Sequence, residues 1–346
     1  MPREGLHYPG SYEAVRSWFP DDDACLDYLD WLRWPDGFAC PHCGCVVSWE
    51  MKGRVRRCAD CRRRVSRTAG TIFQDTRTPL TVWFAAAWYM TSAKNGVSAL
   101  QMQRLLGLGS YQTAWTMLHR FRTAMGLAGQ DKLSGTVEVD ETFVGGEHAG
   151  PGGRGAFGKE IVIVAVELLE PKGFGRVRLA VIPNASTEVL REFLLANIER
   201  GSTVVTDGWQ PYRKAVGDDF DHIRHPISSS GFQAHELLPA VHRVAALLKR
   251  WLLGTHQGSM IGGHLPAYLD EFTFRFNRRR ASHRGLVFYR LLQLAVGAPP
   301  VTYRELVVNS KPKGVRPAGV LGPRGRPGTL ALPPADKPWR QTQSLD

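Results

Sequence analysis

The stretch TVEVDETFVGG, residues 136–146, alternates apolar and polar side chains with a period of two, a pattern that predicts a β-strand. In such a strand the two internal valines face one side of the sheet, whereas Glu138 and Asp140 face the other. The apolar stretches EIVIVAVEL and RVRLAVI follow it and are also typical of strands. The sequence therefore predicts two carboxylates on one face of a sheet.

A further aspartate follows another predicted strand. In STVVTDGW, residues 202–209, Asp207 ends an apolar run at a glycine turn, where a carboxylate is exposed yet rigidly held. A single aspartate at a strand end is usually a turn residue. Two aspartates side by side on strands, however, can bind divalent cations that activate an attacking hydroxyl and stabilise the leaving oxygen in phosphoryl transfer.

The composition is that of a globular protein with a basic surface. Hydrophobic residues make up 43% of the 346 residues and charged residues 22%, and the length suits two or three domains. Lys and Arg number 44 against 32 Asp and Glu, a net charge of +12 that favours a polyanionic partner, although a merely basic protein has the same balance. Because we find neither a run of roughly 18–20 apolar residues nor a signal-peptide pattern, we expect a cytoplasmic protein without a membrane partner.

Periodicity and composition divide the chain into five segments. We expect an N-terminal helical segment, a Cys- and Arg-rich ribbon, a helical region, a strand-rich α/β domain and a disordered basic tail rich in Pro and Gly, over residues 1–34, 35–70, 71–130, 131–300 and 301–346. In the helical region, SALQMQRLLGLGSYQTAWTMLHRFRTAM has a helix–turn–helix layout with glycines at the turn. Its second helix could enter a major groove, or the pair could be a simple packed hairpin.

The cysteines near the N-terminus are spaced for metal binding. CPHC and CADC form a C-x2-C…C-x2-C pattern with 14 residues between the pairs, which predicts one structural zinc site of four thiolates. The predicted ligands are Cys40, Cys43, Cys58 and Cys61. A disulfide framework would be spread further along the chain and would suit a secreted protein. Cys25 and Cys45 are not needed for the zinc site.

Arginines surround the second cysteine pair. The stretch RVRRCADCRRRVSR, residues 54–67, holds seven arginines against one aspartate. Such a run is either a solvated loop or a surface that contacts phosphates, and on a zinc module we expect phosphate contacts. The candidate residues are Arg56, Arg57, Arg62, Arg63 and Arg64.

The order of these motifs resembles that of bacterial insertion-sequence transposases with an N-terminal zinc ribbon and a DDE-type, ISXO2-like catalytic domain. The blocks VEVDETFVGG, VVTDGW, LLKRWLLGTHQG and YLDEFTFRFNRR carry the resemblance, which covers about residues 15–290. It implies an RNase H-like mixed-sheet domain in which two acidic residues and a third residue on a later helix hold two Mg²⁺ or Mn²⁺ ions. It also implies cleavage at transposon ends and joining of the 3′-OH to target DNA, by a homodimer or larger assembly on double-stranded DNA.

On this resemblance Asp140 and Asp207 are the first two catalytic residues. The third is expected about 35 residues further on, and His242 lies 35 residues after Asp207, with Lys249 seven residues after His242. Most DDE enzymes place a glutamate here, and imidazole suits Mn²⁺ better than Mg²⁺. His242 would either ligate a metal ion or form a hydrogen bond to the scissile phosphate or to a metal-bound water. Glu236 is the second candidate for the third catalytic residue. If neither serves, this copy of the transposase is inactive.

The family also carries an E-x3-R-x2-R block, which Glu271, Arg275 and Arg278 match. Offsets of four and seven residues put all three on one helix face, so the carboxylate could orient two guanidiniums toward DNA phosphates. A solvated stripe of ion pairs is the alternative. Lys249 is expected to contact DNA as well.

The expected function is a DNA transposase that binds the ends of an insertion sequence, cleaves strands and joins them to target DNA. Two other interpretations stay open: a catalytically inactive DNA-binding regulator derived from such an enzyme, and a metal-dependent nuclease without strand joining. The presence of both Asp140 and Asp207 favours an enzyme.

Overall fold

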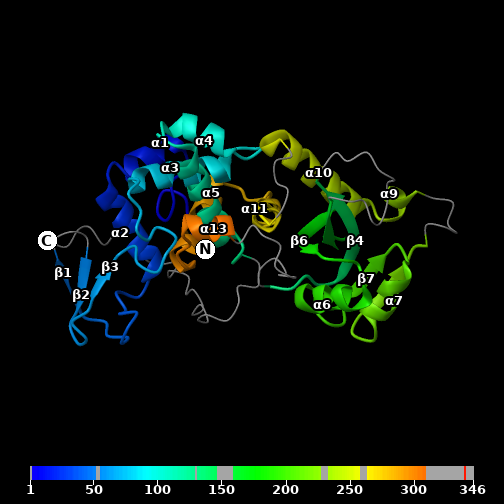
Figure 1. Cartoon of the computed structure of the whole chain (residues 1–346). Helices are drawn as coiled ribbons and strands as arrows, with labels where there is room; N and C mark the ends of the chain where they lie inside the picture. Colours follow the sequence, from blue (N-terminus) through cyan, green and yellow to red (C-terminus); the bar gives the residue numbers. More distant parts are fainter. Residues whose placement is uncertain are drawn as a thin grey trace. The chain divides into compact units, whose positions relative to one another are not determined.

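The structure, a computed structural model, describes most of the chain with short gaps. The described residues are 2–51, 55–128, 131–145, 159–226, 233–257, 263–308 and 339. The chain forms two compact units (Figure 1): the first combines Met1–Leu127 with Arg280–Leu306, and the second contains Ala128–Arg279. In the described ranges we find no helix with the length and apolar character that crossing a bilayer requires.

Helices make up most of the first unit. They are α1 (Tyr12–Trp18), α2 (Asp22–Arg33), α3 (Leu80–Ser92), α4 (Ala99–Leu106), α5 (Tyr111–Met125) and α12 (Arg284–Gly297). The side chains of Asp21 and Ser98 cap α2 and α4 by accepting a hydrogen bond from a backbone N–H of the first turn. The buried faces meet in an aromatic core, where the ring of Phe84 lies against those of Phe19 and Phe288.

The expected helix–turn–helix region consists of α4 and α5, which pack against each other. α4 ends at Gly107, whose φ of 61° is easily adopted without a Cβ, and Ser110 caps α5 through the N–H of Gln112. The C-terminal half of α5 is built into the unit, since Arg122 is buried and Arg120 donates hydrogen bonds to backbone carbonyls. At the start of α5, Tyr111 and Gln112 are exposed.

A small antiparallel sheet lies between α2 and α3 in the sequence. Its strands pair in the order β1 (Ser48–Met51), β2 (Val55–Cys58) and β3 (Arg64–Ser66). The cluster of buried residues in this region consists of Phe38, Cys40, Cys58 and Val65. The sheet therefore buries little apolar surface, and two of its buried side chains are cysteines.

The second unit is built around a five-stranded mixed sheet. Its strands, in spatial order, are β6 (Phe174–Ile182), β5 (Glu160–Leu168), β4 (Thr136–Val144), β7 (Thr203–Thr206) and β8 (Asp221–Arg224). β4, β5 and β6 pair antiparallel, whereas β4, β7 and β8 pair parallel. The predicted mixed α/β sheet is confirmed, and its strand order is that of an RNase H-like domain.

Helices cover both faces of this sheet. One face carries α6 (Thr187–Asn197) and α7 (Gln210–Val216), and the other carries α10 (Pro239–His256), preceded by the short α9 (Ala234–Leu237), and α11 (Leu265–Asn277). Val137 and Val204 belong to the hydrophobic cluster under α6 and α7, and Val164 and Val205 belong to the cluster under α10 and α11. β4 and β7 are thus packed on both sides, which fixes the side chains at their ends.

One helix packs outside the domain in which the sequence analysis placed it. The strand-rich domain was expected to extend over residues 131–300, but α12 packs against α2, α3 and α5 of the first unit. α12 is apolar on most sides, with Val287, Phe288 and Leu291 buried. Such a pattern predicts a buried helix but does not identify the elements that cover it.

Of the basic tail expected over residues 301–346, the structure describes residues 301–308 and Trp339. α13 (Tyr303–Val308) is helical. Trp339 is buried, with its ring against those of Phe19 and Tyr28. The expected disorder of the other tail residues falls outside the described residues.

Candidate active site and metal centre

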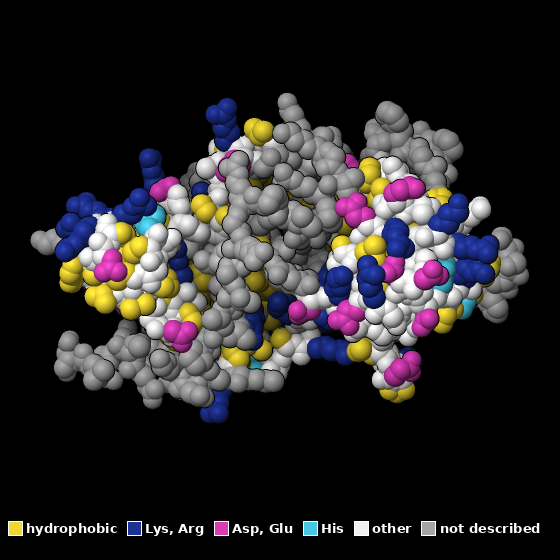
Figure 2. Space-filling model, turned by 90° about the horizontal axis from the view of Figure 1, so that it is seen from below, with side chains coloured by type: hydrophobic (Ala, Val, Ile, Leu, Met, Phe, Trp, Pro, Cys, Tyr) yellow, Lys and Arg dark blue, Asp and Glu magenta, His cyan; other side chains and the backbone are white. Residues whose placement is uncertain are grey.

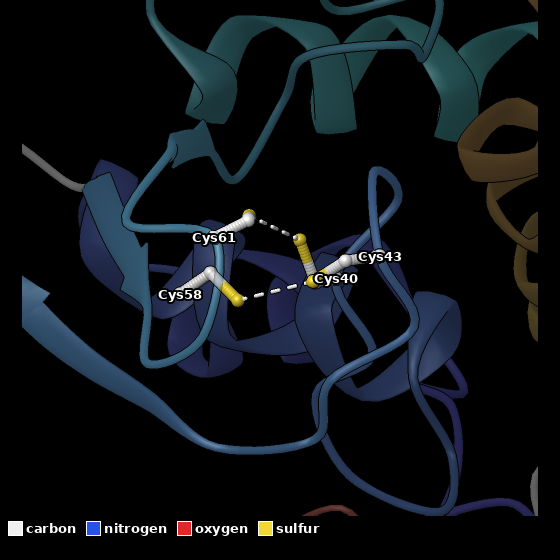
Figure 3. Close-up of side chains that lie close together, drawn as sticks. All are labelled: Cys40, Cys43, Cys58 and Cys61. Carbon is white, nitrogen blue, oxygen red and sulfur yellow. Dashed lines mark hydrogen bonds between the residues drawn. The ribbon is translucent and has the colours of Figure 1, made fainter.

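The four predicted zinc ligands come together in the ribbon (Figure 3). Their sulfur atoms all lie within 4.8 Å of one another, with 3.7 Å between the Sγ atoms of Cys40 and Cys61 and 3.5 Å between those of Cys43 and Cys58. A tetrahedron with metal–sulfur bonds of about 2.3 Å has edges of about 3.8 Å, so the four thiols fit a zinc ion. Within the described part of the chain, no other group of three or more His, Cys, Asp or Glu side chains is gathered this tightly.

Two tight turns hold the cysteine pairs. In the first, the N–H of Gly44, with φ of 76°, donates to the Cys40 carbonyl at 2.9 Å. In the second, Arg62 adopts a left-handed φ of 59° and turns the chain back, so that the N–H of Cys58 donates to the Arg63 carbonyl at 3.0 Å. The spacing of two residues within each cysteine pair is therefore that of a turn.

The first turn also favours the ionised form of its cysteine. Burial raises the pKa of the Cys40 thiol, but hydrogen bonds from the backbone of His42 and Cys43 outweigh it and lower this pKa to about 7. Zinc binds the thiolate, so the turn prepares Cys40 for the metal. Cys45 contacts Val47 instead, with its Sγ 3.4 Å from the Val47 nitrogen.

The arginines around the second cysteine pair divide into two groups. Arg56 donates to Asp30 of α2 at 3.1 Å, so its side chain is held against a helix. The other candidates are exposed: Arg57, Arg62, Arg63 and Arg64. The guanidinium of Arg62 lies 5.1 Å from the ring centroid of Trp49, which is half-exposed. Figure 2 shows Lys and Arg side chains beside hydrophobic ones at this end of the unit.

Sequence reasoning missed the ion pairs of Arg67. This buried side chain donates to Asp30 at 2.7 Å and to Asp27 at 2.5 Å. Burial lowers the pKa of Arg67, but the two carboxylates outweigh this effect, and the pKa is raised overall. Because Asp30 also pairs with Arg56, one carboxylate of α2 ties two arginines of the ribbon to the helical unit. No spacing rule connects residues so far apart in the sequence.

The parallel pairing of β4 and β7 brings Asp140 and Asp207 to neighbouring positions. Glu138 lies opposite Val205, and two residues further along each strand stand the two aspartates. Alternate residues of a strand share a face, and both Val205 and the Glu138 carboxylate pack on the side of α10. By this register Asp140 and Asp207 fall at neighbouring positions, with Asp207 directly after the end of β7.

The turn after β7 fixes Asp207. One oxygen of its carboxylate accepts a hydrogen bond from the N–H of Trp209 at 2.9 Å, and Gly208 has φ of 77°. The hydroxyl of Thr206 accepts from the Gly208 N–H at 3.2 Å and lies 2.9 Å from Nε2 of His222. Residues on three neighbouring segments thus hold the turn, and the Asp207 carboxylate is fixed within it as an aspartate in a turn often is.

α10 brings His242 to Asp140. The Nε2 atom of His242 lies 3.7 Å from Oδ2 of Asp140, and both side chains are partly exposed. The described residues provide no hydrogen-bond partner for this Nε2 atom. Burial lowers the pKa of His242, and His235 and Lys249 lower it further. Among the described residues, Asp140, Asp207 and His242 do not form a group gathered as tightly as the four thiols.

The other two candidates in this region, Glu236 on α9 and Lys249 on α10, lie in different environments. Glu236 is exposed, and its carboxylate accepts a hydrogen bond from the N–H of Gln233 at 2.8 Å, which caps α9 locally. Lys249 is exposed on the same helix as His242, two turns further on. The helix therefore presents both residues of the predicted pair.

Two buried groups lie beside the aspartates, and sequence reasoning missed Tyr212 and the partner of Glu138. The carboxylate of Glu138 accepts hydrogen bonds from the first turn of α10. Tyr212 of α7 is fully buried; burial raises its pKa well above the usual value, and the carboxylates of Glu141, Asp140 and Asp207 raise it further. The alternation of β4 indicated the face of Glu138 but gave no indication of its partner.

The E-x3-R-x2-R residues lie at the end of α11. Glu271 is fully buried, and the Arg275 guanidinium lies 3.5 Å from its carboxylate. Arg278 lies over the ring of Phe274, 4.1 Å from its centroid, and donates to the Phe274 carbonyl at 3.2 Å. The structure thus brings Glu271 and Arg275 together as the pattern predicted. Glu271 is a buried anchor rather than part of a solvated stripe.

Two family models match these regions. The ISXO2-like transposase domain matches residues 132–277, and the transposase zinc-ribbon domain matches residues 20–64. The class is thus a DDE-type transposase domain joined to a zinc ribbon, and such domains bind DNA. The chain is also 28% identical over 277 residues to an uncharacterized protein in transposable element ISH50 of Halobacterium salinarum, with 74% of this chain and 91% of that protein covered. The chain therefore carries a transposase zinc-ribbon domain and an ISXO2-like transposase domain.

Proposed function

We propose that this transposase cuts and joins DNA strands with Asp140, Asp207 and His242 as its catalytic residues. The observation that carries the proposal is the approach of His242 to 3.7 Å from Asp140, on the face where Asp207 is the neighbouring strand residue. The spacing of 35 residues between Asp207 and His242 and the helix that bears Lys249 support the same assignment.

The donor atoms suit divalent cations. Carboxylate oxygens of Asp140 and Asp207 are ligands that Mg²⁺ and Mn²⁺ prefer, and the imidazole of His242 favours Mn²⁺. When bound, two such ions activate the attacking oxygen and stabilise the leaving oxygen. In the first step water attacks the phosphorus at the transposon end and releases a 3′-OH. In the second, this hydroxyl attacks a target phosphodiester and displaces the 3′-oxygen of the target strand.

The DNA-binding residues in this proposal belong to both units. Four exposed arginines of the ribbon would contact backbone phosphates: Arg57, Arg62, Arg63 and Arg64. Arg56 has Asp30 as its partner and would anchor the ribbon. Lys249, Arg275 and Arg278 would hold DNA near the aspartates, with Glu271 orienting Arg275. Because two transposon ends must be brought together, we expect two or more copies on DNA.

A strand-transfer assay tests the function. The full chain, loaded with one zinc ion, is incubated with duplexes that carry the ends of its element, a target plasmid, and Mg²⁺ or Mn²⁺. We expect cleaved and joined products from the wild type. The rate of their formation should fall by at least about 1,000-fold in Asp140→Asn and Asp207→Asn, because each substitution removes a metal ligand. The matched control is Asp218→Asn, an exposed aspartate of the same unit, which should keep full activity.

The outcomes separate the alternatives. Binding of the ends without cleavage in either metal would identify a regulator, and cleavage without joining would identify a nuclease. His242→Glu should shift the preference from Mn²⁺ toward Mg²⁺ if the imidazole ligates metal. Unchanged metal preference together with unchanged turnover in His242→Glu would remove His242 from the catalytic set.

A further inference from the structure

Glu138 is a buried carboxylate that the proposed chemistry does not use. It lies on β4 with 3% of its surface exposed, and its Oε2 atom accepts hydrogen bonds from the N–H groups of Ala240, at 2.8 Å, and Val241, at 3.0 Å. Both donors belong to the first turn of α10, the helix that carries His242.

The start of α10 needs an acceptor from outside the helix. The first N–H groups of any α-helix have no partner within it, and they form the positive end of the helix dipole. At α10 the N-cap residue, Leu238, provides no side-chain hydrogen bond, and Pro239 opens the helix. Glu138 supplies both the acceptor and a negative charge from the neighbouring strand.

The same contact makes burial of the carboxylate tolerable. Burial raises the pKa of Glu138 overall, and the hydrogen bonds from Val241 and Ala240 offset part of this rise. A buried carboxylate is acceptable only where such donors compensate for lost water. These hydrogen bonds are directional and therefore fix one position of α10 on β4. The apolar contacts between α10 and the sheet are not directional.

This contact connects the two sides of the catalytic centre by a short path. Glu138 stands two residues before Asp140 on β4 and shares its face, and His242 directly follows Val241 on α10. The gap between Nε2 of His242 and Oδ2 of Asp140 is 3.7 Å. Any shift of the first turn of α10 against β4 changes this gap directly.

We propose that Glu138 is a positioning residue that fastens the first turn of α10 to β4 and so sets the distance between His242 and Asp140. The inference rests on the proposed catalytic function of those two residues. A helix cap with a merely structural role would affect folding stability alone. Substitution of a positioning residue by one of different side-chain length also changes turnover, even when the variant folds normally.

Two substitutions separate anchoring from folding. Glu138→Asp keeps the charge but shortens the side chain by one methylene, so α10 must shift by about 1 Å to keep the hydrogen bonds. A misplacement of this size costs roughly 100-fold in turnover. We expect kcat for strand transfer to fall by about that factor in Glu138→Asp, with an unchanged KM for end DNA. In Glu138→Gln, which keeps the side-chain length and loses the charge, kcat should fall less, by about 10-fold.

The matched control is Glu167→Gln. Glu167 lies on the adjacent β5, is 7% exposed, and likewise accepts hydrogen bonds from backbone N–H groups, those of Ser134 and Arg176. Among the described residues its hydrogen bonds go to Ser134 and Arg176 rather than to α10, and it forms an ion pair with Arg176. Its loss should therefore lower stability and leave kcat unchanged.

A crystal structure of metal-free Glu138→Asp gives a readout that needs no activity. We expect the gap between His242 and Asp140 to lengthen relative to the wild type and to Glu167→Gln. An unchanged gap, or a folded Glu138→Asp protein with wild-type kcat, overturns the inference. If the wild type joins no strands, the proposed function fails, and the crystallographic comparison still decides whether Glu138 sets the gap.

Discussion

The zinc ribbon and the five-stranded domain are held together by different forces. The ribbon's buried cluster has four members, two of which are zinc-site cysteines. The five-stranded sheet has a hydrophobic cluster on each face. Apolar burial contributes about 25 cal/mol per Å², so the sheet domain has a core of its own, whereas we expect the ribbon to depend on a bound metal. Burial of apolar side chains thus stabilises the sheet domain, whereas metal ligation by the cysteines is expected to stabilise the ribbon.

The largest expected effect is loss of the ribbon without its metal. Structural zinc contributes about 10–16 kcal/mol to the folding of small domains, so Cys58→Ser should unfold residues 35–66. The five-stranded sheet should stay folded. Hydrogen exchange followed by mass spectrometry would show fast exchange in β1, β2 and β3 and unchanged protection in β4, β5 and β7.

Cys45→Ser is the matched control, because Cys45 lies beside the site and contacts Val47 instead. It should retain one zinc ion per chain by atomic absorption and a protected ribbon. Equal zinc loss in Cys45→Ser and Cys58→Ser would show that the ligand set is wrong. Loss of protection in β4 after zinc removal would contradict the contrast between the two regions.

A smaller effect is expected where the ribbon is tied to α2. Arg67→Met leaves the buried carboxylate of Asp30 with Arg56 as its remaining arginine partner, and breaking a buried ion pair costs about 3 kcal/mol. Urea unfolding should show this loss in the first unit. Arg64→Met, on the exposed side of β3, should change stability by less than about 0.5 kcal/mol. Equal losses in both variants would contradict a specific role for Arg67.

The smallest effect distinguishes how the two regions bind DNA. Arg57→Ala should reduce the slope of log Kd against log salt by about 1, because in the proposed function it removes one phosphate contact. Its turnover at saturating DNA should not change. Lys249→Ala should reduce the slope similarly but also lower turnover, because Lys249 lies on the helix of His242. Fluorescence anisotropy across a salt series gives the slopes, and equal turnover in the two variants would contradict the division of roles.

The sequence predicted the ribbon well because its information is local. The two residues between the cysteines of each pair predict a turn. The turns found at Gly44 and Arg62 agree with that spacing. The ion pairs of Arg67 with α2 join residues about 40 positions apart and leave no pattern in the sequence. The same limit applies to α12, whose apolar surface shows that it is buried but not where.

The aspartates and His242 were identified in part from strand alternation and in part from family resemblance. Alternation placed Glu138 and Asp140 on one face, and the parallel register of β4 and β7 then placed Asp207 beside them. The hydrogen bonds from α10 to Glu138 depend on how a helix packs on a strand about 100 residues away. Such a contact is fixed by three-dimensional packing, which a single sequence does not display.

The ribbon leaves and rejoins the helical unit at the same place. Arg33, the last residue of α2, donates to the backbone carbonyl of Arg67 at 3.0 Å, so the chain on either side of the ribbon meets at one point. An insertion whose ends already touch can be lengthened, replaced or removed with little strain on its host, because little loop-closure entropy changes. Zinc ribbons could therefore be exchanged at this junction during evolution or by grafting, while the transposase domain is inherited intact.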